Sequence, residues 1–245
     1  MTSNRKIALA AGVLFIITFV TSIPALYLFQ PVLDDPAGYI AGSGADNTRI
    51  FVGASLELLL IVANVATAAV LFPILKRQNE MLALGYVTAR LVESTFIAIG
   101  LVSVLGVVSL QQQGATGADA GTVGVALAAI KDWTFLLGPG FIVGIGNGLL
   151  LGYLMYESGL VPRRMAMLGL VGGALICVSG VLVLLGVFEQ GGAGQGIATI
   201  PEFFWELSLG VWLTVKGFNA SPILPPDDSY VRPRVAGGAM PAVGD

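Results

Sequence analysis

Long apolar stretches, separated by short polar segments, make up most of this chain. Six of them come close to the length of about 20 residues that a helix needs to cross a hydrocarbon core. They cover residues 7–29, 50–75, 82–110, 133–155, 165–188 and 197–215. Only 11% of the residues are charged, whereas soluble domains average about 25%. The pattern therefore predicts an all-α, polytopic integral membrane protein with six transmembrane helices.

The Lys and Arg residues between these stretches predict an orientation. Those on the side of the N-terminus are Arg5, Lys6, Lys76, Arg77, Arg163, Arg164, Lys216, Arg232 and Arg234, and those on the other side are Arg49 and Lys131. Cytoplasmic loops carry the excess of such residues. We therefore expect both termini in the cytoplasm and a multi-pass protein in the cell (cytoplasmic) membrane.

Two segments outside the apolar stretches bear on the domain organisation. Residues 1–218 form the predicted bundle, and the proline-containing segment 219–245 is predicted to be a disordered cytoplasmic tail because it has no apolar period. The outer loop 111–132 contains an apolar segment at 121–130. This segment either extends the fourth helix outward or lies at the membrane surface, since its pattern is compatible with both.

Charged side chains occur inside the apolar stretches, at Glu57, Arg90, Glu93 and Glu206. Each costs roughly 2.5–3.5 kcal/mol at the bilayer centre, so such residues usually mark a function. At 1.5 Å per residue the three carboxylates fall about 10–14 Å below the outer edge of the membrane, with Arg90 one turn deeper. The predicted intramembrane polar cluster is Glu57, Asn64, Arg90, Glu93, Asn147 and Glu206.

Helical spacing predicts which members of this cluster share a face. Glu57 and Asn64 are seven residues apart, and Arg90 and Glu93 are three apart. One alternative is purely structural, with an Arg90–Glu93 pair and asparagine hydrogen bonds that hold helices together. However, one arginine does not neutralise three carboxylates, so a proton or a bound cation is expected to do so at Glu57 or Glu206. Glu202, which follows Pro201, is expected to cap the start of the sixth helix.

Small residues recur at a regular spacing in the fourth apolar stretch. They are Gly140, Gly144, Gly148 and Gly152. Glycines four residues apart let a neighbouring helix approach closely, so packing is the expected role. The alternative is that the Gly-Pro-Gly segment at 138–140 kinks or breaks the helix and opens carbonyl groups to a cavity.

Several classes of function are disfavoured by what the sequence lacks. The chain has no histidine and a single cysteine, Cys177, which removes histidine-ligated haem, the usual zinc sites and Ser-His or Cys-His catalysis. It contains neither a G-x-S-x-G motif nor a Walker A motif. We therefore expect no enzyme activity, no cofactor and no metal. The net charge of -3 offers no basic surface for nucleic acid.

Three segments carry a resemblance to a known family. They are ARLVE at 89–93, LMYESGLVPRRMAMLGLVGG at 154–173 and ELSLGVWLTVKGF at 206–218. With them the chain resembles the prokaryotic six-helix membrane proteins of domain-of-unknown-function family 4386, over most of residues 5–220. The resemblance implies an integral membrane protein and no particular activity.

Two hypotheses of function follow from these patterns. The first is binding or transport of a small solute or ion through the intramembrane carboxylate cluster, with proton coupling as one form of it. The second is a non-catalytic accessory, sensor or assembly protein whose polar cluster is structural. The lipid bilayer is the one partner that the pattern itself predicts. The pattern specifies no oligomeric state. A cavity that reaches Glu57 and Glu206 favours the first hypothesis, and a dry, fully paired cluster favours the second.

Overall fold

The computed structural model describes residues 2–224, and this part of the chain is helical without any strand. Its elements are α1 (Ser3–Asp34), α2 (Pro36–Ile40), α3 (Asn47–Leu75), α4 (Glu80–Gln112), α5 (Ala118–Phe135), η1 (Leu136–Ile142), η2 (Gly144–Leu151), α6 (Gly152–Ser158), α7 (Arg163–Leu184) and α8 (Ala193–Val215). The two η elements are π-helices, and α5 to α6 form one continuous rod. The predicted all-α class is confirmed.

Five helical segments in the described part are long and apolar enough to cross a membrane: α1, α3, α4, the rod Ala118–Ser158, and α7. The sixth predicted stretch forms α8, which has 23 residues but is not among these five. Its two glutamates and Pro201 make it less apolar than the others. The coarse prediction of a membrane protein is supported by the five helices.

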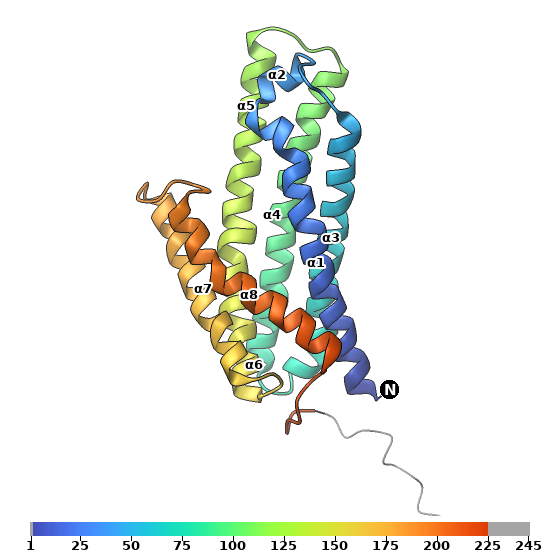
Figure 1. Cartoon of the computed structure of the whole chain (residues 1–245), viewed down its shortest axis with the longest axis vertical. Helices are drawn as coiled ribbons and strands as arrows, with labels where there is room; N and C mark the ends of the chain where they lie inside the picture. Colours follow the sequence, from blue (N-terminus) through green and yellow to red (C-terminus); the bar gives the residue numbers. More distant parts are fainter. Residues whose placement is uncertain (1, 225–245) are drawn as a thin grey trace, which may run out of the picture.

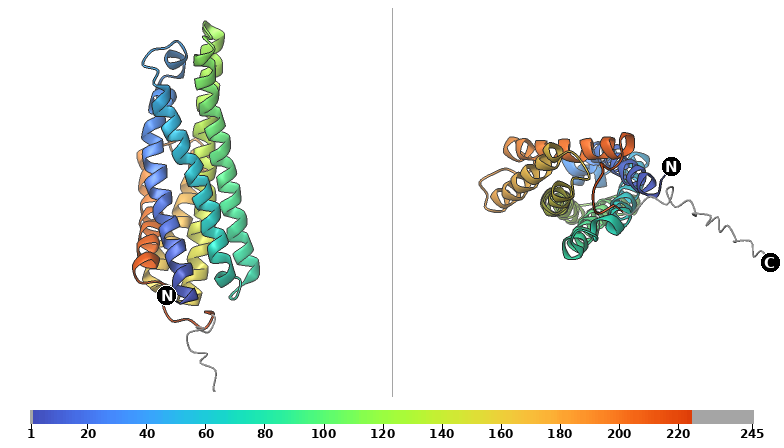
Figure 2. Two further views of the ribbon diagram at one scale, coloured as in Figure 1. Left: turned by 90° about the vertical axis from the view of Figure 1, so that its right-hand side faces the viewer. Right: turned by 90° about the horizontal axis from the view of Figure 1, so that it is seen from below.

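The long helices lie side by side along one axis (Figure 1). α1 packs against α3 and α8, α4 packs between α3 and α5, and α7 packs against η2 and α8. The shorter α7 and α8 form an antiparallel pair, and α8 crosses the first half of α1 obliquely (Figures 1 and 2). The N-terminus and the last described residues lie at the same end of the bundle.

The helix that contains the fourth apolar stretch starts earlier than residue 133, where the hydropathy pattern placed its beginning. α5 begins at Ala118, so residues 121–130 extend the helix outward, which is the first of the two alternatives. The helix also continues through Pro139, which has no N–H to donate to the carbonyl four residues before it. The chain adapts by i→i+5 bonding, in which the N–H of Val143 donates to Gly138 O. The Gly-Pro-Gly segment therefore widens the helix and does not break it.

The glycines of this rod are divided between two neighbours. Gly144, Gly148 and Gly152 face α7, where an added Cβ would meet backbone atoms. Gly138 and Gly146 face α4 instead, at Phe96 and Ala89. Gly140 meets chiefly Phe135 O of its own rod, so it is not part of the close helix contact that the regular spacing predicted.

Two apolar clusters occupy the two halves of the bundle. The cluster near the termini contains Phe15, Leu71, Tyr86 and Trp205 among others. The cluster near α2 contains Phe29, Tyr39, Ile50 and Val104 among others. On α1, α3 and α4 the residues between these two clusters include buried polar side chains. The fold thus places a polar layer between two apolar ones.

Arginines satisfy backbone carbonyls that the helices leave unpaired. Pro31 has no N–H for Tyr27 O, and the Arg49 side chain donates to that oxygen at 2.6 Å. Arg5 donates to Leu213 O and Thr214 O, at 2.8 and 2.7 Å, and so caps the end of α8. These bonds join α1 to α3 at one end and to α8 at the other.

Contacts with the bundle continue beyond its predicted end at residue 218. Asn219 N donates to Leu160 O at 2.8 Å, and Ser221 Oγ donates to Ser158 O at 2.7 Å. Ile223 and Leu224 pack against the apolar cluster near the termini. The start of the predicted tail therefore packs on the bundle, and residues 225–245 lie outside the described residues.

The contact between the rod and α7 predicts different effects for two glycine substitutions. A Cβ at Gly148 would overlap Gly173 and lie 2.8 Å from Glu202 Oε2, whereas nothing lies within 4 Å of a Cβ at Gly196. Gly148→Ala should therefore lower stability by about 1–3 kcal/mol. Gly196→Ala, the matched control within α8, should be neutral or stabilising by up to about 1 kcal/mol. Unfolding of the purified protein in mixed micelles measures both, and equal effects would contradict this packing.

Candidate functional site

A cavity of about 240 Å³ lies in the polar layer between the two apolar clusters. Side chains from α1, α3, α4, α5, η1, α7 and α8 line it. Its polar and charged lining residues are Thr18, Ser22, Glu57, Asn64, Arg90, Glu93, Lys131, Thr134, Thr199, Glu202 and Glu206. Five of the six residues of the predicted cluster are in this lining, and the sixth, Asn147, contacts it through Glu206.

Three of the predicted residues form a closed ring between α3 and α4. Arg90 Nη1 lies 2.6 Å from Glu93 Oε2. Asn64 Nδ2 donates to the other carboxylate oxygen at 2.9 Å, and Arg90 Nη2 donates to Asn64 Oδ1. All three side chains are buried. Arg90 is thereby paired with a carboxylate and an amide through its two terminal nitrogens, and such pairing is what a buried charge requires.

A second ion pair joins α3 to α5. Lys131 Nζ lies 2.5 Å from Glu57 Oε1, and both side chains are buried. A side chain at Gly100 would collide with this lysine, because a Cβ there would lie 2.9 Å from Lys131 Cδ. The sequence interpretation placed Lys131 in the outer loop. That placement was wrong because α5 starts at Ala118, which puts the lysine inside the helix.

Glu206 is held by an amide and not by a cation. Asn147 Nδ2 donates to Glu206 Oε1, which links η2 to α8. Trp205 Nε1 donates to Asn147 O at 2.9 Å and fixes the same contact from the neighbouring residue of α8. Glu206 therefore lines the cavity, and its carboxyl group forms no ion pair within the described residues.

Glu202 is a second residue that the sequence interpretation assigned wrongly. It was expected to cap a helix start, but α8 begins at Ala193 and Glu202 lies well inside it. Its side chain lines the cavity and is only 2% exposed. Neither carboxylate oxygen has a hydrogen-bond partner within residues 2–224.

Glycines make the room for the Glu202 carboxylate. A Cβ at Gly148 or at Gly172 would lie 2.8 Å from Glu202 Oε2, so only glycine leaves that space free. Glu202 and Glu206 are four residues apart and share the face of α8 that lines the cavity. This spacing is the sequence signal that could have found Glu202.

The site as a whole holds more acidic groups than basic ones. Four carboxyl groups, those of Glu57, Glu93, Glu202 and Glu206, share the cavity with Arg90 and Lys131. Both cations are already paired. The surplus therefore belongs to Glu202 and Glu206, and not to Glu57 as the sequence interpretation had it. Among residues 2–224 no group of three or more His, Cys, Asp or Glu side chains has an arrangement that could hold a metal ion.

The Glu57–Lys131 pair makes a prediction about stability. Lys131→Met leaves the Glu57 carboxylate buried without its partner, which should cost about 3–5 kcal/mol. The double change Glu57→Leu and Lys131→Met removes both charges and should cost far less. Lys76→Met, at an exposed lysine, is the control and should change stability little. The free energy of unfolding in bicelles measures each variant, and additive losses in the cycle would show that the two residues do not stabilise one another.

Comparison with known proteins identifies the chain's family. A search of curated proteins and a search of solved structures each gave no match. The family described as Domain of unknown function (DUF4386) has a model that matches residues 10–217. This range contains the whole polar lining of the cavity and confirms the resemblance that the three sequence segments carried. The chain belongs to the DUF4386 family.

Proposed function

We propose that this protein binds and carries a small positively charged solute in its intramembrane cavity. The observation that supports this most is the Glu202 carboxylate, which is buried against the cavity without a hydrogen-bond partner in the described residues. An isolated carboxylate in a medium of low polarity is strongly unfavourable. A cation that enters the cavity compensates it, and Glu206, one turn away, adds a second acceptor.

The other charges of the cavity have a scaffolding role in this proposal. The ring of Asn64, Arg90 and Glu93 is closed on itself and joins α3 to α4. The Glu57–Lys131 pair joins α3 to α5. Paired charges of this kind hold helices in place without a ligand. In the alternative function, the protein is a non-catalytic accessory, sensor or assembly component. That function requires only this scaffolding role and no ligand.

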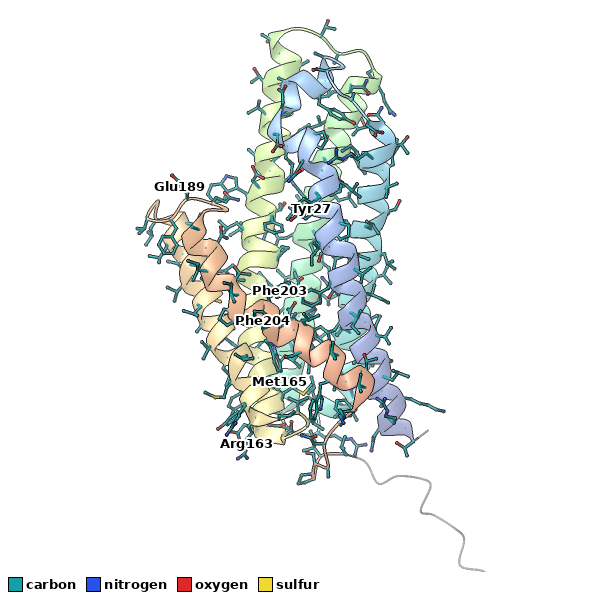
Figure 3. All side chains as sticks on the ribbon, viewed as in Figure 1. Tyr27, Arg163, Met165, Glu189, Phe203 and Phe204 are labelled. Atoms are coloured by element: carbon teal, nitrogen blue, oxygen red, sulfur yellow. The ribbon has the colours of Figure 1, made fainter. Side chains whose placement is uncertain are left out.

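The proposal includes six crossings of the cell membrane with both termini in the cytoplasm. In this arrangement α8 is the sixth crossing, since it runs antiparallel to α7 and ends where α1 begins (Figure 1). Basic residues gather at that end, as Figure 3 shows for Arg163, while Glu189 lies toward the other end of α7 and α8. Arg5 caps α8 there, at the same end. The positive-inside rule assigns this end to the cytoplasm.

Cysteine labelling tests the orientation. In a Cys177→Ala background, cysteines at Ser43 and Glu189 should react with an impermeant thiol reagent added to intact cells. Cysteines at Glu80 and Ala220 should react only after permeabilisation. All four positions are exposed in the structure, so access to the reagent depends on the membrane. Labelling of Ala220→Cys from outside would show that α8 does not cross.

Ligand-induced stabilisation tests the binding. Ethylammonium chloride should raise the melting temperature of the purified protein relative to sodium chloride at the same ionic strength, whereas sodium propionate should not. A ligand at 100 times its Kd stabilises by about 2.7 kcal/mol. Glu202→Gln should abolish the shift, because the amide has no charge to offer the cation. Glu157→Gln, at an exposed glutamate away from the cavity, should retain it.

The two functions give opposite results in this experiment. The accessory function expects no shift from any ion, and it expects Glu202→Gln to be as stable as the parent chain or more so. A shift of equal size in the parent chain and in Glu202→Gln would show that the cation acts elsewhere, and it would overturn the proposal.

A further inference from the structure

The cavity opens sideways, through the wall of the bundle, and not along its axis. Four apolar side chains that line it are also exposed on the outer surface: Ile23 and Leu26 on α1, both at 43%, Phe135 on α5, at 45%, and Phe203 on α8, at 39%. The cavity is only partly enclosed, and these exposed lining side chains lie where it meets the outer surface. The two apolar clusters lie beyond the cavity in the two axial directions.

The packing of the helices explains this opening. α1 packs against α3 and α8, while α5 packs against α4 and α2, and α1 and α5 have no extensive contact in the described residues. α8 crosses obliquely and covers the first half of α1, which leaves the second half uncovered on this side (Figure 1). Figure 3 shows Phe203 on α8 with Tyr27 of α1 farther toward the α2 end.

The surface around the opening is apolar. Val20 and Tyr27 on α1, and Ile200 and Phe204 on α8, are exposed next to the residues of the opening. Ser22 and Thr199 are the small polar groups in the nearby lining. The outer surface of a helical bundle at membrane depth faces hydrocarbon. The opening therefore connects a site rich in carboxylates to the lipid phase.

We propose that the solute is a membrane-dissolved amphiphile with an ammonium head, whose hydrocarbon tail leaves the cavity between α1 and α5. This inference rests on the proposed function and specifies its substrate class. The head lies at Glu202 and Glu206, where the surplus carboxylates are, and the tail passes Ile23 and Phe203 into the bilayer.

The size of the cavity supports a ligand that is only partly enclosed. Its volume of about 240 Å³ is below the roughly 300–1,000 Å³ of pockets that bury whole drug-sized ligands. It holds an ammonium group and the first carbons of a chain. The rest of a longer tail stays among lipid chains in both the free and the bound state. A longer tail should therefore not weaken binding. Carboxylates on the inside and phenylalanines at the opening match the two ends of such a molecule.

The test compares two ammonium ions in nanodiscs of neutral lipid. Decylammonium, added at a fixed fraction of the lipid, should stabilise the parent chain, while decanoate and decanol at the same fraction should not. Glu202→Gln should abolish stabilisation by decylammonium and by ethylammonium. Ile23→Trp narrows the opening and should weaken decylammonium binding at least tenfold more than it weakens ethylammonium binding, because the smaller ion fits inside the cavity.

Val102→Trp is the matched control for the opening. Val102 is 69% exposed on α4 and does not line the cavity, so this variant should bind both ions as the parent chain does. A decylamine with a photoreactive diazirine in mid-chain gives a second measurement that needs no variant at the opening. It should label peptides that contain Ile23 or Phe203 more than those that contain Val102, and this preference should disappear in Glu202→Gln.

The outcomes separate this inference from the proposed function. Binding of ethylammonium without decylammonium, or binding of decylammonium that Ile23→Trp leaves unchanged, would overturn the lateral opening and leave cation binding in place. Failure of both ions to bind would overturn the proposed function itself, and the inference with it. Stabilisation by decanoate would show that the head group is not a cation. Uniform photolabelling of all lipid-facing peptides would show that the tail has no defined path.

Discussion

Compensation of buried charge is the constraint on which the rest of this structure depends. A charge surrounded by hydrocarbon is strongly unfavourable unless a partner lies within hydrogen-bond distance. The Glu57–Lys131 pair and the ring of Asn64, Arg90 and Glu93 meet this condition, and both reach across helix boundaries. They fix α3 relative to α4 and α5, and so they set the walls of the cavity. Glu202 does not meet the condition, which makes it the residue where function is most strongly indicated.

Close backbone contact is the second constraint, and it brings Glu202 to the cavity. α7 approaches η2 at Gly144, Gly148 and Gly173, where no Cβ intervenes. α8 then approaches α7 at Gly172, where an added Cβ would lie 2.7 Å from Glu202 Cα. With larger residues at these positions α8 would be displaced outward, and Glu202 and Glu206 would move with it. The cavity is therefore acidic because α7, α8 and the rod pack closely enough to bring these two glutamates to it.

Hydropathy predicted the helices well, but it could not place their ends. It assigns a polar residue at the edge of an apolar stretch to a loop, although a helix in a bundle continues when the polar group finds a partner inside. Lys131 was misplaced for this reason, and Glu202 was misplaced because α8 starts at Ala193. Helical spacing did predict that Arg90 and Glu93 share a face, and they form an ion pair. The departure of Gly140 from the contact with α7 was not predictable, because it depends on π-helical bonding around Pro139.

The Gly148–Gly173 contact also limits how this chain can change over evolutionary time. A clash between two side chains can be relieved by a smaller residue at the facing position, so such pairs can vary together. No residue is smaller than glycine, so a larger residue at Gly148 cannot be compensated by a smaller one at Gly173. The Glu57–Lys131 pair is different, since both members can be exchanged at once for apolar residues. Related sequences should therefore show correlated changes at the ion pair and fixed glycines at the helix contact.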